Sequence, residues 1–168
     1  MVDVWLPYGK TEVCINIPTR NYLGSIEPKD KKAVPDAISE IKRALNEPIS
    51  AKKLAEIAGP DSKVAIVVDD ATRPTPSHLM VPPILEELEA AGVRTEKITV
   101  IFGCGTHRPV SENEAIKILG EDVVKRVRVI SHDCKAPDLV YLGDTSKHGT
   151  KVYVNRVFAE ADVKILTG

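Results

Sequence analysis

The sequence predicts an α/β protein with a Rossmann-like, mainly parallel sheet flanked by helices and an N-terminal β-hairpin. Strand-like and helix-like segments alternate as β-α-β-α-β, an order typical of parallel sheets with right-handed crossovers. The run from Lys63 to Asp69 is almost continuously aliphatic, which indicates a strand covered on both faces. The 168 residues are 43% hydrophobic, enough to build one domain with a real core. We therefore expect residues 1–168 to form a single α/β domain.

The N-terminal part of the chain predicts a hairpin followed by two helices. Residues 2–7 and 11–17 are β-prone runs on either side of a Tyr-Gly-Lys turn. A polar loop covers residues 18–32, and residues 34–46 carry apolar side chains at helical spacing. Ser50 is expected to cap a second, short helix.

The central part predicts two helices between buried strands. We expect the first helix to hold Pro82 and Pro83 in its first turn, where proline is tolerated best, and to end at Gly92. The run from Ser111 to Glu114 is a capping box, which predicts a second helix that ends at Gly120. The remaining strand candidates are residues 97–102, 127–130, 139–142, 152–154 and 163–166.

Composition and charge exclude several classes of function. The formal net charge is -1 and only 4% of residues are aromatic, so neither an electrostatic field nor a base-stacking surface indicates nucleic acid. No apolar run approaches the roughly 20 residues of a membrane span, and the N-terminus lacks a signal peptide's basic start. An odd number of cysteines, Cys14, Cys104 and Cys134, indicates reduced thiols in a cytoplasmic protein. We expect a small-molecule ligand, with no nucleic acid and no membrane as partner.

Three unusual loops follow the three predicted central strands. Their residues are 69–76 (Asp-Asp-Ala-Thr-Arg-Pro-Thr-Pro), 103–109 (Gly-Cys-Gly-Thr-His-Arg-Pro) and 131–133 (Ser-His-Asp). Ligands of open α/β sheets bind beyond the carboxyl ends of the strands. We therefore expect all three loops to face one crevice.

The first loop offers a carboxylate and a guanidinium. Pro74 and Pro76 stiffen the backbone that presents Arg73, whose guanidinium can hold a carboxylate through two parallel hydrogen bonds. Asp70 can accept a hydrogen bond from a hydroxyl or orient a base. The alternative is an ordinary Asp70–Arg73 ion pair that braces the loop.

The other two loops each offer a histidine. Gly103 and Gly105 allow close backbone approach, so that His107 can project into a ligand pocket as a proton-transfer group. The alternative for His107 is a hydrogen bond to a loop carbonyl, and Arg108 is expected to brace the loop or to stay solvated. His132 can act as a second base or a metal ligand, although such a residue more often bonds to backbone.

Two functions other than catalysis are compatible with these loops. Arg73 and the loop at 70–77 can form a non-catalytic module that binds a carboxylate or phosphate. Alternatively, a small zinc-stabilised domain can use two thiols and two imidazoles as ligands, although their spacing is not a common zinc pattern. Those four candidate ligands are Cys104, His107, His132 and Cys134.

Together, the first two loops resemble the N-terminal domain of the lactate racemase family, and the resemblance covers essentially the whole chain. It implies an isomerase that racemises or epimerises a 2-hydroxy acid by hydride transfer to a nickel-pincer nucleotide, a pyridinium-3-thioamide-5-thiocarboxylic acid mononucleotide. It also implies a role for each of three residues. His107 matches a catalytic acid/base, Arg73 matches the group that binds the substrate carboxylate, and Asp70 matches the acidic residue that supports the site.

The same resemblance implies that the chain is the catalytic N-terminal half of a longer two-domain protein. The lysine that tethers the cofactor and the histidine that binds nickel are expected beyond residue 168, and Lys164 does not match the tether. We expect the 168 residues alone to carry neither metal nor cofactor and to be inactive. The identity of the 2-hydroxy acid and the oligomeric state are left open.

Overall fold

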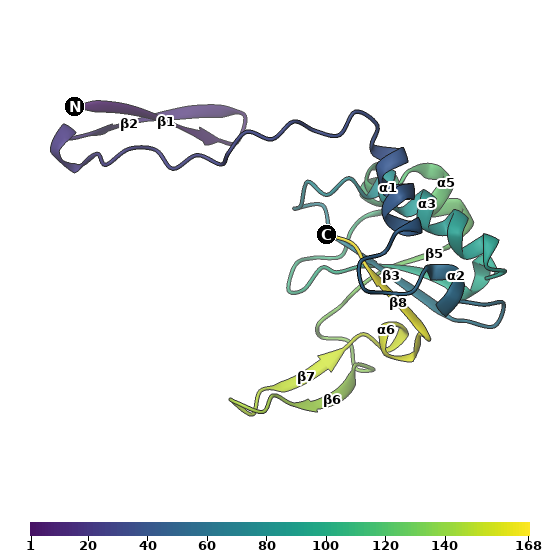
Figure 1. Ribbon diagram of the computed structural model, residues 1–168. Coiled ribbons are helices and arrows are strands. Elements are labelled where there is room, and N and C mark those ends of the chain that lie inside the picture. Colours follow the sequence, from purple (N-terminus) through teal and green to yellow (C-terminus); the bar gives the residue numbers. More distant parts are fainter. The chain divides into compact units, whose positions relative to one another are not determined.

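A computed structural model describes all residues from 1 to 168, and they form two compact units, residues 1–33 and 34–168. The first unit is the predicted hairpin, in which β1 (Val2–Tyr8) pairs antiparallel with β2 (Thr11–Ile17) (Figure 1). Gly9 has φ +62, which suits the first position of a two-residue turn. A short 3-10 turn, η1 (Thr19–Asn21), follows the second strand.

The second unit is built on a four-stranded sheet whose neighbouring strands all run parallel, in the order β5-β4-β3-β8. Ile66 in β3 lies opposite Val100 in β4 on one side and Ile165 in β8 on the other. The predicted fold class is therefore confirmed. The four strands are β3 (Val64–Val68), β4 (Ile98–Phe102), β5 (Arg128–Ser131) and β8 (Val163–Leu166).

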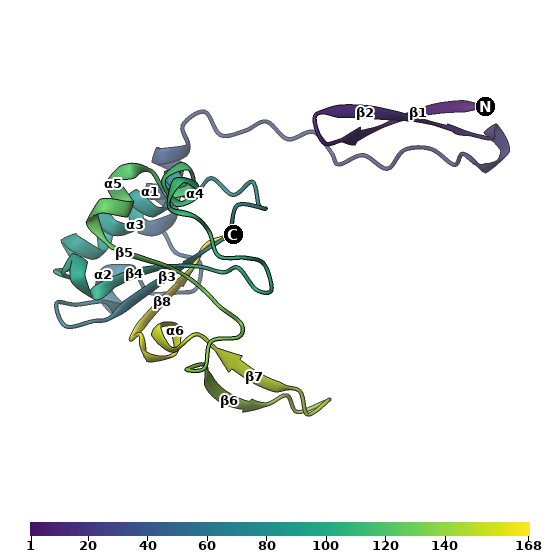
Figure 2. The same cartoon turned by 180° about the vertical axis from the view of Figure 1, so that it is seen from behind.

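The two faces of the sheet are covered very differently. Figures 1 and 2 show most of the helices on one face, where the larger core forms around Ile66, Leu85 and Phe102. The other face has a smaller core around Ala65 and Ile101. The helices that contribute to the larger core are α1 (Ala37–Asn46), α2 (Leu54–Ile57), α3 (Ser77–Ala90), α4 (Glu112–Leu119) and α5 (Glu121–Arg126).

The second face has one short helix, α6 (Arg156–Glu160), whose Phe158 packs against the smaller core. The antiparallel hairpin of β6 (Val140–Asp144) and β7 (Lys151–Val154) precedes α6. The periodicity of the sequence predicted both of these strands but not α6. A helix of five residues is too short to show a helical repeat.

The first two helices begin at other residues than predicted. The predicted starts were residue 34 for the first helix and a cap at Ser50 for the second. The first helix begins at Ala37, because the Asp36 carboxylate accepts hydrogen bonds from the backbone N–H groups of Ile38 and Ser39. Ser50 does not cap the second helix, which begins at Leu54. Its φ of +51 is left-handed, whereas a capping residue needs extended backbone.

The prediction that Pro82 and Pro83 open a helix is wrong. The helix α3 begins five residues earlier, at Ser77, so both prolines lie inside it. Val81 is buried in the larger core and Pro83 is also buried, and this packing outweighs the two backbone N–H donors that the prolines lack. The predicted capping box of Ser111 and Glu114 is present at the start of α4.

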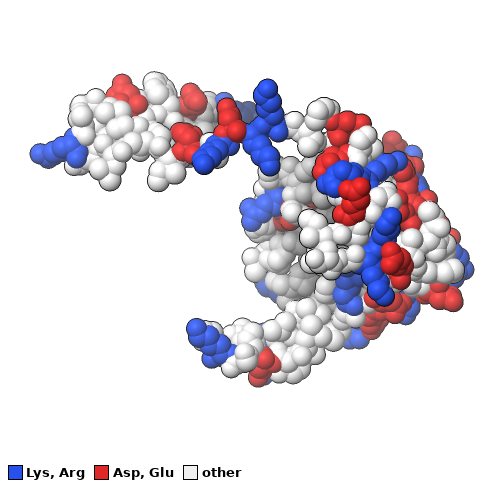
Figure 3. Space-filling model, viewed as in Figure 1, with Lys and Arg blue, Asp and Glu red and all other residues white.

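Charged side chains of both signs are interspersed over the helical layer, as Figure 3 shows. Many of them form ion pairs, such as Lys42 with Glu86 at 2.8 Å and Arg126 with Glu89 at 2.7 Å. None of the helices combines the length and the apolar character that a membrane span requires. On the face shown in Figure 3, the helical layer has no patch of one sign that would indicate a polyanionic partner.

Candidate functional site

The candidate site lies at the carboxyl edge of the sheet, where β3 and β8 are neighbours. The strand order reverses between these two strands, and ligands of open α/β sheets bind at such a point. Asp69 and Asp70 directly follow β3. Thr167, which follows β8, donates through its backbone N–H and its hydroxyl to the carbonyl of Val67, at 3.0 and 3.2 Å. The ends of both strands therefore meet beside the first loop.

The loop after β4 folds back onto the end of β3. Gly103 donates its backbone N–H to the carbonyl of Val68 at 2.8 Å, and the Cys104 side chain is buried in the larger core. Of the two glycines in this loop, Gly105 has the positive φ, at +56. The backbone N–H of His107 then donates to the Cys104 carbonyl at 2.8 Å. This tight turn brings His107 towards Asp70.

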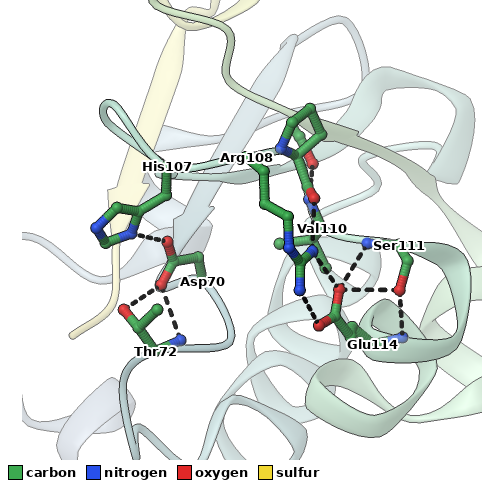
Figure 4. Close-up of polar contacts among 9 residues, drawn as sticks. Asp70, Thr72, His107, Arg108, Val110, Ser111 and Glu114 are labelled. Atoms are coloured by element: carbon green, nitrogen blue, oxygen red, sulfur yellow. Dashed lines mark hydrogen bonds and ion pairs between the residues drawn. The ribbon is translucent and has the colours of Figure 1, made fainter.

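Asp70 and His107 form a hydrogen-bonded pair. The His107 Nδ1 atom lies 2.6 Å from the Asp70 Oδ2 atom (Figure 4). The Asp70 carboxylate is 7% exposed, whereas the His107 side chain is 53% exposed. Figure 4 shows the second ring nitrogen of His107 pointing away from the carboxylate. This contact brings the first two of the three loops together.

Hydrogen bonds hold Asp70 in its ionised form. The Thr72 hydroxyl, the His107 ring and the Thr72 backbone N–H lower the pKa of Asp70 to about 2. At neutral pH the proton in the Asp70–His107 bond therefore belongs to Nδ1 of the histidine. In the neutral ring, that tautomer leaves the Nε2 atom with a free lone pair, as an acid/base group requires.

Arg73 lies in the same loop without joining this pair. Its backbone N–H donates to the Asp70 carbonyl at 3.2 Å, but its guanidinium takes part in none of the ion pairs of the chain. The alternative of an Asp70–Arg73 ion pair is therefore wrong, because Thr72 and His107 take the carboxylate instead. Arg73 lines a cleft of about 330 Å³ that Asp70 also borders.

Arg108 braces the second loop against α4. Its guanidinium makes two hydrogen bonds with the Glu114 carboxylate, at 2.7 and 2.8 Å (Figure 4). Arg108 and the Ser111 N-cap lower the pKa of Glu114. Since Glu114 is also part of the capping box, the loop that carries His107 is tied to the start of a helix. The predicted bracing role of Arg108 is confirmed.

The third loop does not join the site. His132 lines a separate, largely apolar cleft of about 230 Å³, with Ile101 and Phe158 of the smaller core. Its backbone N–H donates to the Phe102 carbonyl, and its buried Nδ1 atom has no partner. Asp133 accepts a hydrogen bond from the backbone N–H of Lys135. The expectation of one crevice for all three loops is therefore wrong, because His132 opens onto the face of the smaller core and β4 separates β5 from β3.

The structure offers no support for the zinc alternative. No three histidine, cysteine, aspartate or glutamate side chains are grouped so that they can hold a metal ion. Cys14, Cys104 and Cys134 are all free thiols. Thr72 was not predicted from the sequence as a partner of Asp70. A threonine two residues after an aspartate is a known signal for such a local hydrogen bond.

Comparison with known proteins assigns these loops to a family. Residues 8–168 match the family model described as the lactate racemase N-terminal domain. The chain belongs to this lactate racemase family. The resemblance based on the motifs at 69–76 and 103–109 is thereby confirmed.

Two lactate racemases align with the whole of this domain. The chain is 28% identical over 170 residues to the lactate racemase of Thermoanaerobacterium thermosaccharolyticum. It is 30% identical over 172 residues to the lactate racemase of Lactiplantibacillus plantarum. It spans 40% of the length of each of these relatives. The alignments therefore establish the family of this domain over its whole length.

Solved structures agree with this assignment. The lactate racemase apoprotein of Thermoanaerobacterium thermosaccharolyticum superposes with a TM-score of 0.79 at 26% identity, covering 98% of this chain and 38% of that one. A Thermotoga maritima protein superposes with a TM-score of 0.59 at 26% identity, covering 77% of this chain and 32% of that one. The fold of the lactate racemase N-terminal domain is thus present over nearly the entire chain.

Proposed function

We propose that this domain supplies the acid/base and the carboxylate-binding group of an isomerase that racemises or epimerises a 2-hydroxy acid. The observation that carries the proposal is the Asp70–His107 pair, with a 2.6 Å bond that orients a half-exposed imidazole. A base held by a third group is the arrangement that general acid/base catalysis requires. Membership of the lactate racemase family supports the same reaction.

The chemistry of a 2-hydroxy acid matches the two free groups of the site. Its carboxylate and its hydroxyl lie on adjacent carbons. The Arg73 guanidinium, which has no partner in the chain, can hold the carboxylate through two parallel hydrogen bonds. The Nε2 atom of His107 can take the hydroxyl proton as the alcohol becomes a carbonyl, and it can return that proton when the alcohol re-forms.

The family implies a nickel-pincer nucleotide in the full-length enzyme, which would accept the Cα hydride and return it to either face. The residues described here do not supply a metal site, since no group of three suitable ligands exists among them. Lys164 lies in β8, where its Nζ atom donates to the Ala161 carbonyl and sits over the Phe158 ring. It is therefore not placed as a tether, and we assign no cofactor contact to this chain.

A second candidate function is a non-catalytic module that binds a carboxylate or phosphate. The observation in its favour is that Arg73 lines the 330 Å³ cleft, whereas His107 borders a different, smaller hollow of about 60 Å³ beside Asp70. This candidate predicts that the 168-residue chain binds a small anion without nickel. In both cases we propose a cytoplasmic protein with a small-molecule ligand, and in the first case also a C-terminal domain of the same protein as its partner.

The decisive experiment is an enantiomer-resolved assay of the full-length, cofactor-loaded protein against a panel of 2-hydroxy acids that begins with D- and L-lactate. We expect interconversion of at least one member, with a loss of roughly 10²–10⁴-fold in His107→Ala and a large loss in Arg73→Ala. His148→Ala and Arg94→Ala are matched controls, because both side chains are exposed and lie outside the site.

The two candidates give different results in this assay. No interconversion across the panel, with the cofactor confirmed by mass, would contradict the isomerase proposal. Anion binding that is retained without nickel and lost in Arg73→Ala would then support the binding module. Full activity in His107→Ala would remove His107 from the mechanism.

A further inference from the structure

Thr72 makes two hydrogen bonds to a single oxygen of Asp70. Its hydroxyl donates to the Asp70 Oδ1 atom at 2.6 Å, and its backbone N–H donates to the same atom at 2.9 Å. The other oxygen, Oδ2, is left to His107 at 2.6 Å. Figure 4 shows the three residues in this order, with Thr72 and His107 on opposite oxygens of one carboxylate.

Because Thr72 and His107 bond to different oxygens, they restrict the rotation of the Asp70 carboxylate. A carboxylate held at one point can rotate about its last bond and present either oxygen to a neighbour. Two donors on Oδ1 fix that rotation, so that Oδ2 points at the imidazole. Because Asp70 is almost fully buried, water does not compete strongly for the same oxygens.

We propose that Thr72 is a positioning residue for His107, which fixes the imidazole as the Nδ1–H tautomer and leaves Nε2 free for proton transfer. Thr72 does not touch the reacting atoms in this account. It acts through Asp70, in the way that an outer hydrogen-bond partner orients a base. The proposal rests on the proposed function for its catalytic meaning, but the tautomer can be measured without any turnover.

Arg108, the other charged side chain beside His107, is already engaged. It lines the small hollow together with Asp70, Thr72 and His107, but its guanidinium is held by Glu114 at 2.7 and 2.8 Å. Asp70 is therefore the charged partner that decides the His107 tautomer. The hydroxyl of Thr72 is the side-chain group that sets the rotation of the Asp70 carboxylate.

The neighbouring aspartate provides a matched control. Thr75 donates its hydroxyl to the Asp69 Oδ2 atom at 2.5 Å, a bond of the same type one residue earlier in the chain. Asp69 has no contact with His107 among the hydrogen bonds of the structure. Removing the Thr75 hydroxyl therefore perturbs the same loop without disturbing the Asp70–His107 pair.

The test is ¹⁵N NMR of the histidine rings in the 168-residue chain, at mildly alkaline pH where imidazoles are neutral. We expect His107 to be mainly the Nδ1–H form in the wild type, in Thr72→Ser and in Thr75→Val. In Thr72→Val and Thr72→Ala the ratio of Nδ1–H to Nε2–H should fall roughly tenfold, because a charge-assisted hydrogen bond is lost. An unchanged ratio in both variants, with the fold intact by NMR, would overturn the proposal.

The catalytic consequence is measured separately in the full-length, cofactor-loaded enzyme. Thr72→Val should lower kcat roughly tenfold with little change in KM, and Thr72→Ser should restore kcat. Equal kcat in the wild type and Thr72→Val would overturn the positioning role. If the enzyme shows no isomerase activity at all, the proposed function fails, whereas the tautomer ratios still decide whether Thr72 fixes His107.

Discussion

The loops after β4 and β5 each carry a histidine at the carboxyl edge of the sheet, but only one of these histidines has a partner. His107 is half-exposed and bonded to a buried carboxylate. His132 lines an apolar cleft, and its buried Nδ1 atom has no hydrogen bond. The difference arises because β4 is adjacent to β3, the strand that delivers Asp70, whereas β5 is one strand further away. Strand order therefore decides which histidine acquires an orienting acid.

Asp70 in the first loop and Asp133 in the third loop differ in their hydrogen bonds, since three reach the Asp70 carboxylate and one reaches that of Asp133. Hydrogen bonds lower the pKa of Asp70 to about 2 from its ordinary value of 3.8. The ionised form is thus stabilised by folding. This contribution is present above the ordinary value and is lost as the pH falls from there towards 2.

We expect Asp70→Asn to lower the free energy of unfolding by about 2 kcal/mol at neutral pH, with the gap to the wild type closing below about pH 4. Urea unfolding at several pH values measures this gap. Asp133→Asn is the control, since its exposed carboxylate accepts a single backbone hydrogen bond, and its gap should be much smaller. A gap of the same size for both variants, or one that does not depend on pH, would contradict the account.

Replacing His132 by an apolar residue should have a smaller effect, of the opposite sign. The buried Nδ1 atom of His132 lacks a partner, so its desolvation is uncompensated. We expect His132→Leu to be neutral or to stabilise the chain by up to about 1 kcal/mol in urea unfolding. A decrease of more than about 2 kcal/mol in the free energy of unfolding would show that the His132 side chain makes an important polar contact. It would then resemble His107 in having a partner.

Much of the fold can be predicted from local sequence signals, and the elements that were misplaced or missed depend on packing or are very short. The aliphatic run at 64–68 predicts β3, and the capping box at Ser111 predicts α4, because each signal needs only a few neighbouring residues. The start of α3 was misplaced because burial of Val81 and Pro83 overrides the local preference of proline. The short helices α5 and α6 have too few turns to show a repeat.

The site was predictable in part. The sequence indicated Asp70 as an orienting acid and His107 as a base, and the structure places them in contact. It did not reveal that the loop carrying His132 lines the other side of the sheet. The strand before this loop, β5, has only four residues, too few to show an alternation of polar and apolar side chains from which its orientation can be read. Nor could it show that the guanidinium of Arg73 is left without a partner in the chain.

We propose that Asp70 acts on catalysis through His107, and a double-mutant cycle tests this coupling most directly. The kcat/KM of the full-length, cofactor-loaded enzyme would be compared for the wild type, Asp70→Asn, His107→Ala and the double variant. We expect a large loss of kcat/KM in each single variant and no further loss in the double variant beyond that of His107→Ala. Losses that multiply would show that the two residues act independently, and would contradict the account.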